Sequence, residues 1–545
     1  MSVAHQAESH RAVVLLDTPL SFHGGLRLDS HNAQATAEPV IAAPIPRRLV
    51  LPLHQHIGAA AKPLVVEGER VLKGQAIAAA HGYVSAGLHA PTSGRVVEIA
   101  EHPVPHPSGL LAPCIVIDCD GEDRWVADSR LQAVDPICLD AATLRQRVRD
   151  AGIVGLGGAA FPTAVKLNPG PDRRLELLLL NGAECEPYIC CDDMLMRERP
   201  RRIVSGAAIM CRALGLERCV IGVEDNKPEA IAALQEAIAE TGGGWLELRQ
   251  VPSVYPTGGE KQLIQVLTGH EVPSNGLPAD IGIVCHNVGT AAAVHDALVE
   301  GRPLISRYLT VTGGGVQQPR NLEVLIGTPI ADLVKACGGY TEAASRLILG
   351  GPMMGFAVAH DDIPVIKGSN CVLVATTAEI GEPAAALPCI RCGDCAEACP
   401  ASLLPQQLYW HTRAKDFDRV QDYHLFDCIE CGCCAVVCPS HIPLVQYYRF
   451  AKNQIWALER ERELAEMARR RHELRLERLA REQRERDEKM SKKRVALDGG
   501  PDKAAKKAVI EAALERARAK KAAQAEPSAS VESASEQSAS GSEER

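Results

Sequence analysis

Two copies of one cysteine pattern, C-x2-C-x2-C-x3-C-P, constrain this 545-residue chain more than any other feature. The second copy begins at Cys428, 39 positions after the first begins at Cys389. In such runs three thiolates bind one [4Fe–4S] cubane, and the fourth cysteine reaches the other cluster. The spacing therefore predicts two clusters with crossed ligand sets: Cys389, Cys392, Cys395 and Cys438 for one, and Cys428, Cys431, Cys434 and Cys399 for the other.

A zinc site and a disulfide scaffold are the alternatives to iron–sulfur clusters. Zinc prefers closed sets of four ligands, and a third cysteine in each run is then left over. Residues 1–11 lack the apolar core of a signal peptide, so we expect a reducing compartment, which disfavours disulfides. The spacing favours clusters over both alternatives, and it leaves Cys433 without a role.

Composition limits the classes of protein to which the chain can belong. The length predicts three to five domains. A net charge of −9 and an aromatic content of 3% argue against a nucleic-acid partner. No apolar run approaches the roughly 18 to 20 residues of a membrane span. We therefore expect a protein that is soluble or peripheral to a membrane.

The order of apolar segments and of the glycine and proline turns between them predicts a multidomain fold of class α/β plus β. The first domain is a small β domain over residues 1–125. Short apolar segments there alternate with glycine turns, which predicts a sandwich or barrel. Residues 71–75 and 90–96 resemble the two halves of a biotinyl/lipoyl-type barrel-sandwich domain. The hairpin between them carries no carrier lysine, so we interpret the domain as a structural or docking module.

Two further domains are expected between residues 135 and 365. In residues 135–295, apolar runs at 175–180, 219–223 and 281–285 alternate with helical patterns. This order predicts a parallel, Rossmann-like sheet whose ligands gather at the carboxyl ends of its strands. In residues 300–365, short β segments flank a helix at 330–336, which predicts a β-grasp unit.

The cysteine domain spans residues 385–450, and its long spacer favours a helical ferredoxin over the compact βαβ type. Residues 455–525 form a charged helical pattern without a sustained apolar stripe, which is typical of a solvated helix. Residues 526–545 are rich in Ser, Glu and Ala, and we expect them to be disordered.

A second group of motifs lies in the α/β region. Residues 155–163 form a glycine-rich loop, with Lys166 just after it. Glycines let a phosphate approach the backbone N–H groups closely, and a lysine adds positive charge. Three polar segments, 181–187, 255–261 and 287–290, stand at strand ends or in turns. Their amide and acid groups suit hydrogen bonds to a cofactor's ring edge, ribityl chain or ribose.

These segments resemble the FMN- and NADH-binding subunit of respiratory complex I. With the β domain in front and two clusters behind, residues 1 to about 450 resemble the C subunit of the Rnf ion-translocating electron-transport complex. The resemblance implies a peripheral protein on the cytoplasmic face of the bacterial inner membrane. It also implies FMN and NAD(H) as cofactors, other subunits of the complex as partners, and ferredoxin as a further candidate partner.

The resemblance also implies a set of binding residues. The FMN phosphate and ribityl chain would contact Gly155, Gly157, Gly158, Lys166, Asn181, Asn287 and Thr290. The flavin edge or nicotinamide would contact Tyr255, Gly259 and Glu260, while Phe161 would stack on the dinucleotide, Glu186 would bind its ribose, and Glu184 completes the acidic turn. The loop departs from the complex I pattern at Leu156, Ala160 and Ala164, which affects the dinucleotide end more than the FMN end.

NADH releases electrons as a hydride, whereas a [4Fe–4S] cluster accepts one electron at a time, so a flavin is needed between them. The expected function is electron transfer between NAD(H) and ferredoxin coupled to ion translocation, through FMN and both clusters. Two alternatives stay open. One is an electron-relay or scaffold subunit without its own NADH site, and the other is a soluble iron–sulfur flavoprotein dehydrogenase.

Overall fold

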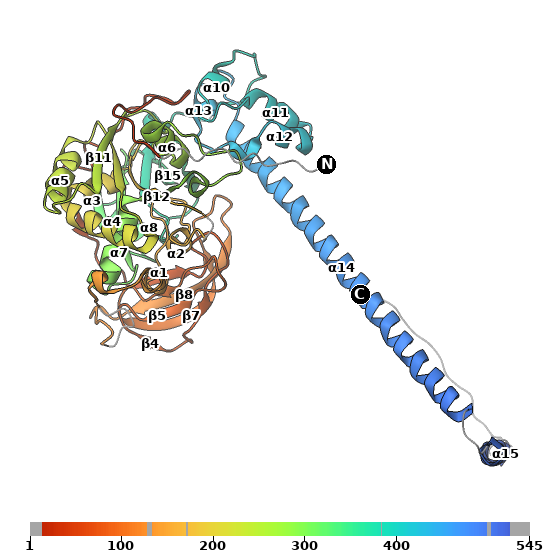
Figure 1. Cartoon of the computed structure of the whole chain (residues 1–545). Helices are drawn as coiled ribbons and strands as arrows, with labels where there is room; N and C mark the ends of the chain where they lie inside the picture. The colour runs from red at the N-terminus through yellow and green to blue at the C-terminus, as the bar shows by residue number, and fades with distance from the viewer. Residues whose placement is uncertain (1–12, 128–132, 171–172, 383, 499–502, 524–545) are drawn as a thin grey trace, which may run out of the picture. The chain divides into compact units, whose positions relative to one another are not determined.

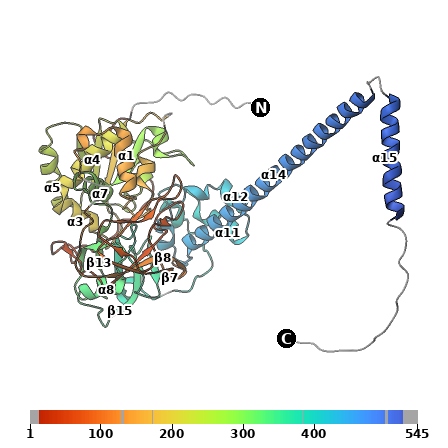
Figure 2. The same cartoon turned by 90° about the horizontal axis from the view of Figure 1, so that it is seen from below.

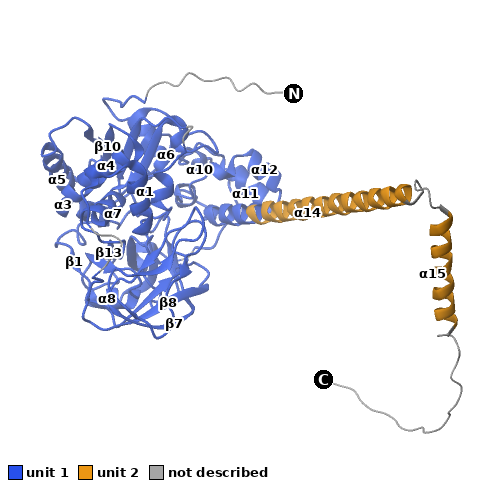
Figure 3. Ribbon diagram, turned by 60° about the horizontal axis from the view of Figure 1, so that its bottom comes forward, with its two compact units in different colours: residues 1–455 blue, residues 456–545 orange. Residues whose placement is uncertain are grey.

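The computed structural model describes residues 13–127, 133–170, 173–382, 384–498 and 503–523 (Figure 1). The expectations for residues 1–11 and 526–545 fall outside this part of the chain. The chain divides into two compact units, residues 1–455 and residues 456–545 (Figure 3). Among the described residues, no helix combines the length and apolar character that crossing a membrane requires.

The N-terminal β module consists of two small antiparallel sheets. One has the order β2 (Arg48–Pro52), β8 (Leu111–Cys119), β7 (Gly94–Pro103), β4 (Arg70–Val71), and the other has the order β3 (Lys62–Pro63), β5 (Ala76–Ala79), β6 (Leu88–His89). Alternate residues such as Leu49, Leu51, Ile115 and Ile117 are fully buried. The residues between them, Val50, Cys114 and Val116, are buried in a separate apolar cluster, so both faces of β2 and β8 are covered.

Residues 13–46, here called the N-terminal strap, precede the first strand of that module and bond to other domains. The strap's strand β1 (Ile41–Ala42) pairs in parallel with β14 (Arg320–Leu325). The Leu16 amide donates to the Leu267 carbonyl at 3.0 Å, and Leu26 bridges to Tyr255. Buried backbone groups need partners, and those of the strap lie in domains far along the chain. The two sheets of the module therefore start at Arg48 and not at the beginning of the predicted 1–125 span.

The central α/β domain has a four-stranded parallel sheet with helices on both faces. The sheet order is β11 (Leu246–Val251), β10 (Cys219–Glu224), β9 (Leu177–Gly182), β12 (Ile283–Asn287). The other elements are η1 (Pro136–Cys138), α1 (Ala141–Asp150), α2 (Thr163–Lys166), α3 (Cys191–Glu198), α4 (Pro200–Leu214), α5 (Pro228–Ala239), α6 (Glu260–Thr268), η2 (Pro278–Ile281) and α7 (Val288–Val299). Leu178 and Leu180 pack into one apolar cluster and Leu177 and Leu179 into another, so both faces of β9 are buried.

The next domain is a six-stranded mixed sheet that carries one main helix, α8 (Ile330–Ala336). Its order is β1, β14, β13 (Ser306–Thr312), β17 (Cys371–Thr376), β15 (Ala344–Leu349), β16 (Phe356–Val358). The sheet extends beyond the predicted boundary at residue 365, because β17 lies at its centre. That strand pairs in parallel with β13 and antiparallel with β15. A short helix, α9 (Thr377–Ile380), follows it.

The cysteine domain is helical, and between residues 384 and 455 the described chain contains no strand. Its elements are α10 (Asp394–Glu397), α11 (Pro405–Arg413), α12 (Phe417–Asp422), η3 (Leu425–Asp427), α13 (Cys433–Val436) and the start of α14 (Leu444–Asp498). Figures 1 and 2 both place α11 and α12 at the opposite end of residues 1–455 from α5. The long charged helix predicted from 455 to 525 instead begins at Leu444, because Tyr448 and Ile455 pack into the cysteine domain. A separate helix, α15, spans Lys503–Ala523.

A buried lysine joins three of these domains. The Lys367 ammonium donates to the Gly87 carbonyl of the β module and to the Gly152 carbonyl of the α/β domain, both at 2.6 Å. The Lys367 amide donates to the Gln55 side chain at 3.0 Å. Burial lowers the pKa of Lys367 to about 7. The arrangement of these domains therefore depends partly on hydrogen bonds that one buried lysine donates.

We expect Lys367→Met to lower the free energy of unfolding by about 2–4 kcal/mol, because both carbonyls would lose their partner in a buried site. Urea denaturation measures the change. The control is Lys335→Met, which removes an exposed lysine from α8 and should change stability little. Equal stability of the two variants would contradict the role given to Lys367.

Candidate functional site

A cavity of about 710 Å³ opens at the carboxyl ends of β9 and β12. Its volume lies within the range of cofactor sites. Of the predicted cofactor-binding residues, all but one line it: Gly155, Gly157, Gly158, Phe161, Lys166, Asn181, Glu184, Glu186, Tyr255, Gly259, Glu260 and Asn287. The exception is Thr290, which lies under the loop and accepts a hydrogen bond from the Leu156 amide at 3.0 Å.

The glycine loop is fixed from behind and open toward the cavity. The Gly155 amide donates to the Phe161 carbonyl, and the Arg307 guanidinium donates to the Leu156 carbonyl at 3.2 Å. Gly158 has a φ of +106°, and a Cβ there would meet no atom within 4 Å. A side chain at this position would therefore strain the backbone and point into open space. The loop has the form that close approach of a phosphate or ribityl chain requires.

Two asparagines build the floor of the cavity. Asn181 and Asn287 stand side by side in the parallel register of β9 and β12. The Asn181 amide group donates to the Gly258 carbonyl at 2.8 Å, and Asn287 Oδ1 accepts from the Gly289 amide at 2.8 Å. The Asn287 amide group also donates to Asp192 at 2.5 Å. Both side chains thus hold the surrounding backbone in place while they line the cavity.

Lys166, which was predicted to supply positive charge at the site, forms an ion pair. Lys166 Nζ lies 2.5 Å from Glu260 Oε2, and both side chains are partly exposed. Glu260 is the first residue of α6, where the helix dipole favours a negative charge. An anionic ligand in this cavity would compete with Glu260 for the lysine.

Glu184 and Glu186, the two acidic residues predicted to bind the cofactors, accept hydrogen bonds from backbone amides of different segments. Glu184 accepts hydrogen bonds from the amides of Asp192 and Asp193, at 2.9 and 3.0 Å, at the start of α3. Burial, reinforced by Asp192, raises the pKa of Glu184 to about 8. Glu186 Oε1 accepts from the amides of Met353 and Met354, at 2.9 and 2.7 Å. This oxygen, predicted to bind a ribose, therefore joins the α/β domain to the loop between β15 and β16.

Two cavity residues escaped the sequence analysis. Gln262 Oε1 and His286 Nε2 are buried, line the cavity and have no hydrogen-bond partner. Burial lowers the pKa of His286 well below its usual value, so its ring is neutral. Buried polar atoms without partners are uncommon, and a polar ligand such as FMN would supply partners for both. The only available signal was the position of His286 directly before Asn287.

Eight cysteines of the two runs line two separate cavities, four in each. Cys389, Cys392, Cys395 and Cys438 line the first, and Cys428, Cys431, Cys434 and Cys399 line the second. Each set combines three thiols from one run with the last thiol of the other. Cys433 lines neither cavity; it is fully buried and packs near Tyr255.

The spacing of the cysteine sulfurs in the two sets bears on whether they suit zinc or an iron–sulfur cluster. In the described residues, the groups of three or more ligand atoms that lie within 4.8 Å of one another are Glu184, Cys191, Asp192 and His295, Asp296, Glu300. Neither group contains a cysteine of the two runs. A zinc ion bound by thiolates would place its sulfurs about 3.8 Å apart. None of the twenty cysteines forms a disulfide. This geometry suits the wider cubane better than zinc or disulfides.

The large cavity and the Cys428 set are adjacent. Ile429 lines both the large cavity and the cavity of this cysteine set. The buried Tyr255 hydroxyl donates to the Cys431 carbonyl at 2.6 Å. Lys261 of α6 pairs with Asp427 at 3.2 Å, just before Cys428. The Cys389 set contains Cys392, which is exposed. The tyrosine expected at the flavin edge therefore also binds the backbone of the cysteine domain.

Four family descriptions match successive parts of the chain. The RnfC barrel sandwich hybrid domain matches residues 20–122, and the Nuo51 FMN-binding domain matches residues 148–296. The SLBB domain matches residues 308–357, and the 4Fe-4S dicluster domain matches residues 388–442. The second match covers the whole parallel sheet, and the last contains all eight cysteines of the two runs.

Curated relatives named as the C subunit of an ion-translocating oxidoreductase complex share much of this sequence. The Pseudomonas aeruginosa protein is 52% identical over 469 residues, which are 86% of this chain and 60% of that protein. The Rhodobacter capsulatus protein is 47% identical over 435 residues, 80% of this chain and 83% of that protein. Among solved structures, a chain of an NAD+-reducing [NiFe]-hydrogenase in the H2-reduced state has a TM-score of 0.42 and 18% identity, covering 61% of this chain and 63% of that one. This chain thus spans 60% of the length of the Pseudomonas relative.

Substitution of single cysteines tests the crossed sets. We expect Cys438→Ser to eliminate the same electron paramagnetic resonance signal as Cys389→Ser, because both line one cavity, and to lower iron content by about half. Cys399→Ser should match Cys428→Ser. The control is Cys433→Ser, which should retain both signals. Loss of the Cys428-set signal in Cys438→Ser would show that the sets are not crossed.

The buried carboxyl of Glu184 predicts a pH dependence. Its folded-state pKa of about 8 exceeds the usual 4.5, so between these values the folded chain retains a proton that the unfolded chain releases. The free energy of unfolding should then fall as pH rises, by up to about 1.4 kcal/mol per unit. Glu184→Gln should flatten this slope between pH 5 and 8, measured by denaturation, whereas the exposed Glu342→Gln should not. An unchanged slope in Glu184→Gln would contradict the assignment.

Proposed function

The chain belongs to the family of C subunits of ion-translocating oxidoreductase complexes, and we propose that it carries electrons between NAD(H) and the other subunits of such a complex through FMN and two [4Fe–4S] clusters. The observation that carries this proposal is the contact between the large cavity and the Cys428 set through Ile429 and Tyr255. A nucleotide-sized cavity beside a cluster site is the arrangement that electron transfer between them requires.

FMN, when bound, supplies the conversion between paired and single electrons that this task needs. The chain's residues position it. The open backbone of Gly157 and Gly158 would receive the phosphate and ribityl chain, with Lys166 supplying positive charge. Gln262 and His286 have unpaired polar atoms for its remaining groups. Phe161 and Glu186 line the part of the same cavity that we assign to the dinucleotide.

The cysteine sets define an order for the relay. The Cys428 set adjoins the large cavity, so we propose that it binds the cluster nearest to the flavin. The Cys389 set includes the exposed Cys392, and we propose that its cluster exchanges electrons with a partner. Lys452 donates to the Cys428 carbonyl at 2.7 Å and pairs with Glu430. A cation so close to the Cys428 set favours the reduced, more negative state of its cluster.

The family also supplies the proposed setting of the chain. We propose a peripheral position on the cytoplasmic face of the bacterial inner membrane, with the other subunits of the complex as partners and ferredoxin as the second redox partner of the whole complex. The described helices contain no candidate membrane span, which is consistent with attachment through those subunits.

One observation favours a second candidate, a relay subunit without its own NADH site. Glu186, expected at the dinucleotide ribose, and Tyr255, expected at the flavin edge or nicotinamide, already bind backbone groups of other domains. The dinucleotide side therefore has fewer free polar groups than the FMN side. NADH oxidation by the isolated chain separates the two candidates.

The test is an anaerobic assay of the purified chain with FMN and both clusters bound. We expect NADH to bleach the flavin and cluster absorbance and to drive reduction of ferricyanide. A chain that binds FMN and is reduced by dithionite but not by NADH would support the relay candidate. A chain that holds both clusters but binds no FMN would contradict the first candidate and also support the relay candidate.

A matched pair of glycine variants tests the cavity as the FMN site. Gly158→Val should lower FMN affinity at least about tenfold, because a side chain would enter the cavity and strain the loop. Gly170→Val is the control: Gly170 has a φ of +100° and equally open space but does not line the cavity. Flavin fluorescence measures both affinities, and equal affinities would place FMN elsewhere.

A further inference from the structure

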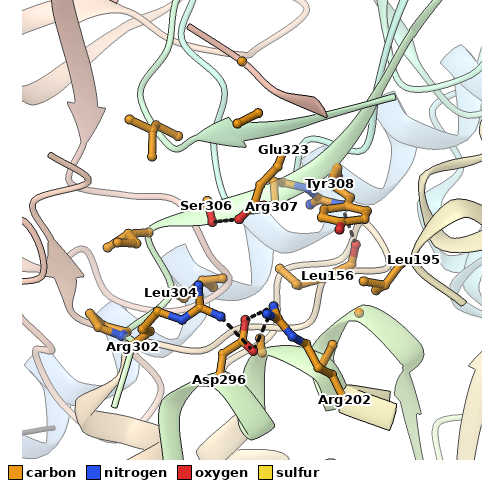
Figure 4. Close-up of a pocket in the computed structure, with 18 of the residues that line it drawn as sticks. Leu156, Leu195, Arg202, Asp296, Arg302, Leu304, Ser306, Arg307, Tyr308 and Glu323 are labelled. Atoms are coloured by element: carbon orange, nitrogen blue, oxygen red, sulfur yellow. Dashed lines mark hydrogen bonds and ion pairs between the residues drawn. The ribbon is translucent and has the colours of Figure 1, made fainter. Parts of the chain in front are cut away.

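A further cavity, of about 380 Å³, lies behind the glycine loop, and we call it the rear cavity (Figure 4). Leu156 and Arg307 line the rear cavity, whereas the loop residues Gly155 and Gly157 line the large cavity. Arg307 belongs to β13 and is 5% exposed. It lies outside residues 148–296, which match the FMN-binding domain. A side chain of the six-stranded sheet therefore supports the glycine loop from the side opposite the large cavity.

All three side-chain nitrogens of Arg307 donate to backbone carbonyls. Nη2 donates to the Leu156 carbonyl at 3.2 Å, which Figure 4 shows as a dashed line. Nη1 donates to the Lys367 carbonyl at 2.5 Å, and Nε donates to the Tyr308 carbonyl at 3.1 Å. A guanidinium presents its donors in a rigid, planar fork, so it holds several carbonyls in one arrangement. The direction of the Leu156 carbonyl is thereby fixed relative to β13 and to Lys367.

The direction of that carbonyl determines what the loop presents to the large cavity. The Leu156–Gly157 peptide bond is trans, and the carbonyl and the N–H of a trans peptide point in opposite directions. Because Arg307 holds the Leu156 carbonyl at the rear, the Gly157 N–H points away from Arg307, toward the cavity that Gly157 lines. Among the described residues this N–H has no hydrogen-bond acceptor. The guanidinium also polarises the peptide, which makes its N–H a better donor.

We propose that Arg307 is a positioning residue that makes the large cavity select FMN over riboflavin, the same flavin without its phosphate. The inference rests on the FMN site proposed above. With the Leu156 carbonyl held at the rear, the Gly157 N–H donates to a phosphate oxygen. Without Arg307 that peptide is free to rotate, and a carbonyl oxygen that faces the phosphate repels it. Riboflavin has no charge at this position, so its affinity depends much less on the direction of the peptide.

Lys166 alone does not account for such selection. Its ammonium is partly exposed and already paired with Glu260, so water and a carboxylate compete with the phosphate for it. The Gly157 N–H has no competing acceptor among the residues that the structure describes. Because Arg307 fixes this peptide beforehand, the loop need not reorganise when the phosphate binds.

Titration of the full chain with FMN and with riboflavin, followed by flavin fluorescence, tests the proposal. Arg307→Met keeps the length of the side chain but removes its donors. We expect the affinity for FMN to fall about tenfold and that for riboflavin to change less than about threefold, because only FMN loses a hydrogen bond to a charged group. A purely structural role of Arg307 would weaken both equally. An equal loss for both flavins, or an unchanged FMN affinity, would overturn the proposal.

Arg202→Met is the matched control. Arg202 also lines the rear cavity, but it pairs with Asp296 and Glu300, so this variant should keep the wild-type ratio of FMN to riboflavin affinity. Arg307→Lys keeps a charged donor without the fork and should lower the same ratio about threefold. Unfolding temperature verifies that each variant is folded. An unchanged ratio in folded Arg307→Lys, or an equal decrease in Arg202→Met, would refute the role of Arg307 even if Arg307→Met does not fold.

The wild-type chain separates this inference from the proposed function. Tighter binding of FMN than of riboflavin is expected. Equal affinities for the two flavins would overturn selection by Arg307 and leave the flavin site in place. Binding of neither flavin would overturn the FMN site and this inference with it.

Discussion

The hydrogen bond from the Tyr255 hydroxyl to the Cys431 carbonyl joins the two chemically active parts of this protein. A buried phenol needs a partner, and here the partner belongs to the loop of the Cys428 set. Ile429 completes the contact, because it lines both cavities. Two domains with unrelated folds are thereby held at a fixed separation, which is the requirement for electron exchange between their cofactors.

At the other domain junctions of residues 1–455, buried ionisable side chains form hydrogen bonds, mostly with backbone groups of the neighbouring domain. Lys367 and Arg307 donate to carbonyls of neighbouring domains, and Glu186 accepts from the amides of Met353 and Met354. Apolar clusters supply the bulk of the favourable burial, but a cluster tolerates sliding. Hydrogen bonds to backbone are directional and do not allow the domains to slide against one another, so they set the orientation of the cavity walls.

Much of the fold followed from local patterns. The apolar runs at 175–180, 219–223 and 281–285 became strands β9, β10 and β12, and the predicted helix at 330–336 matches α8. The strap and the central strand β17 were not predictable in the same way. Their roles come from pairing with β14 and β13, which are remote in the chain, and no local periodicity encodes a remote partner.

The cysteine spacing and the polar residues after each apolar run are local properties, so the chain alone specified which side chains gather around the two kinds of site. The tertiary structure decides which of those side chains remain available to a ligand. Tyr255 and Glu186 are bonded to residues 431, 353 and 354, whereas Gln262 and His286 keep unpaired polar atoms. A buried polar group can be satisfied by a ligand or by distant backbone, and only the packing of the domains selects between them.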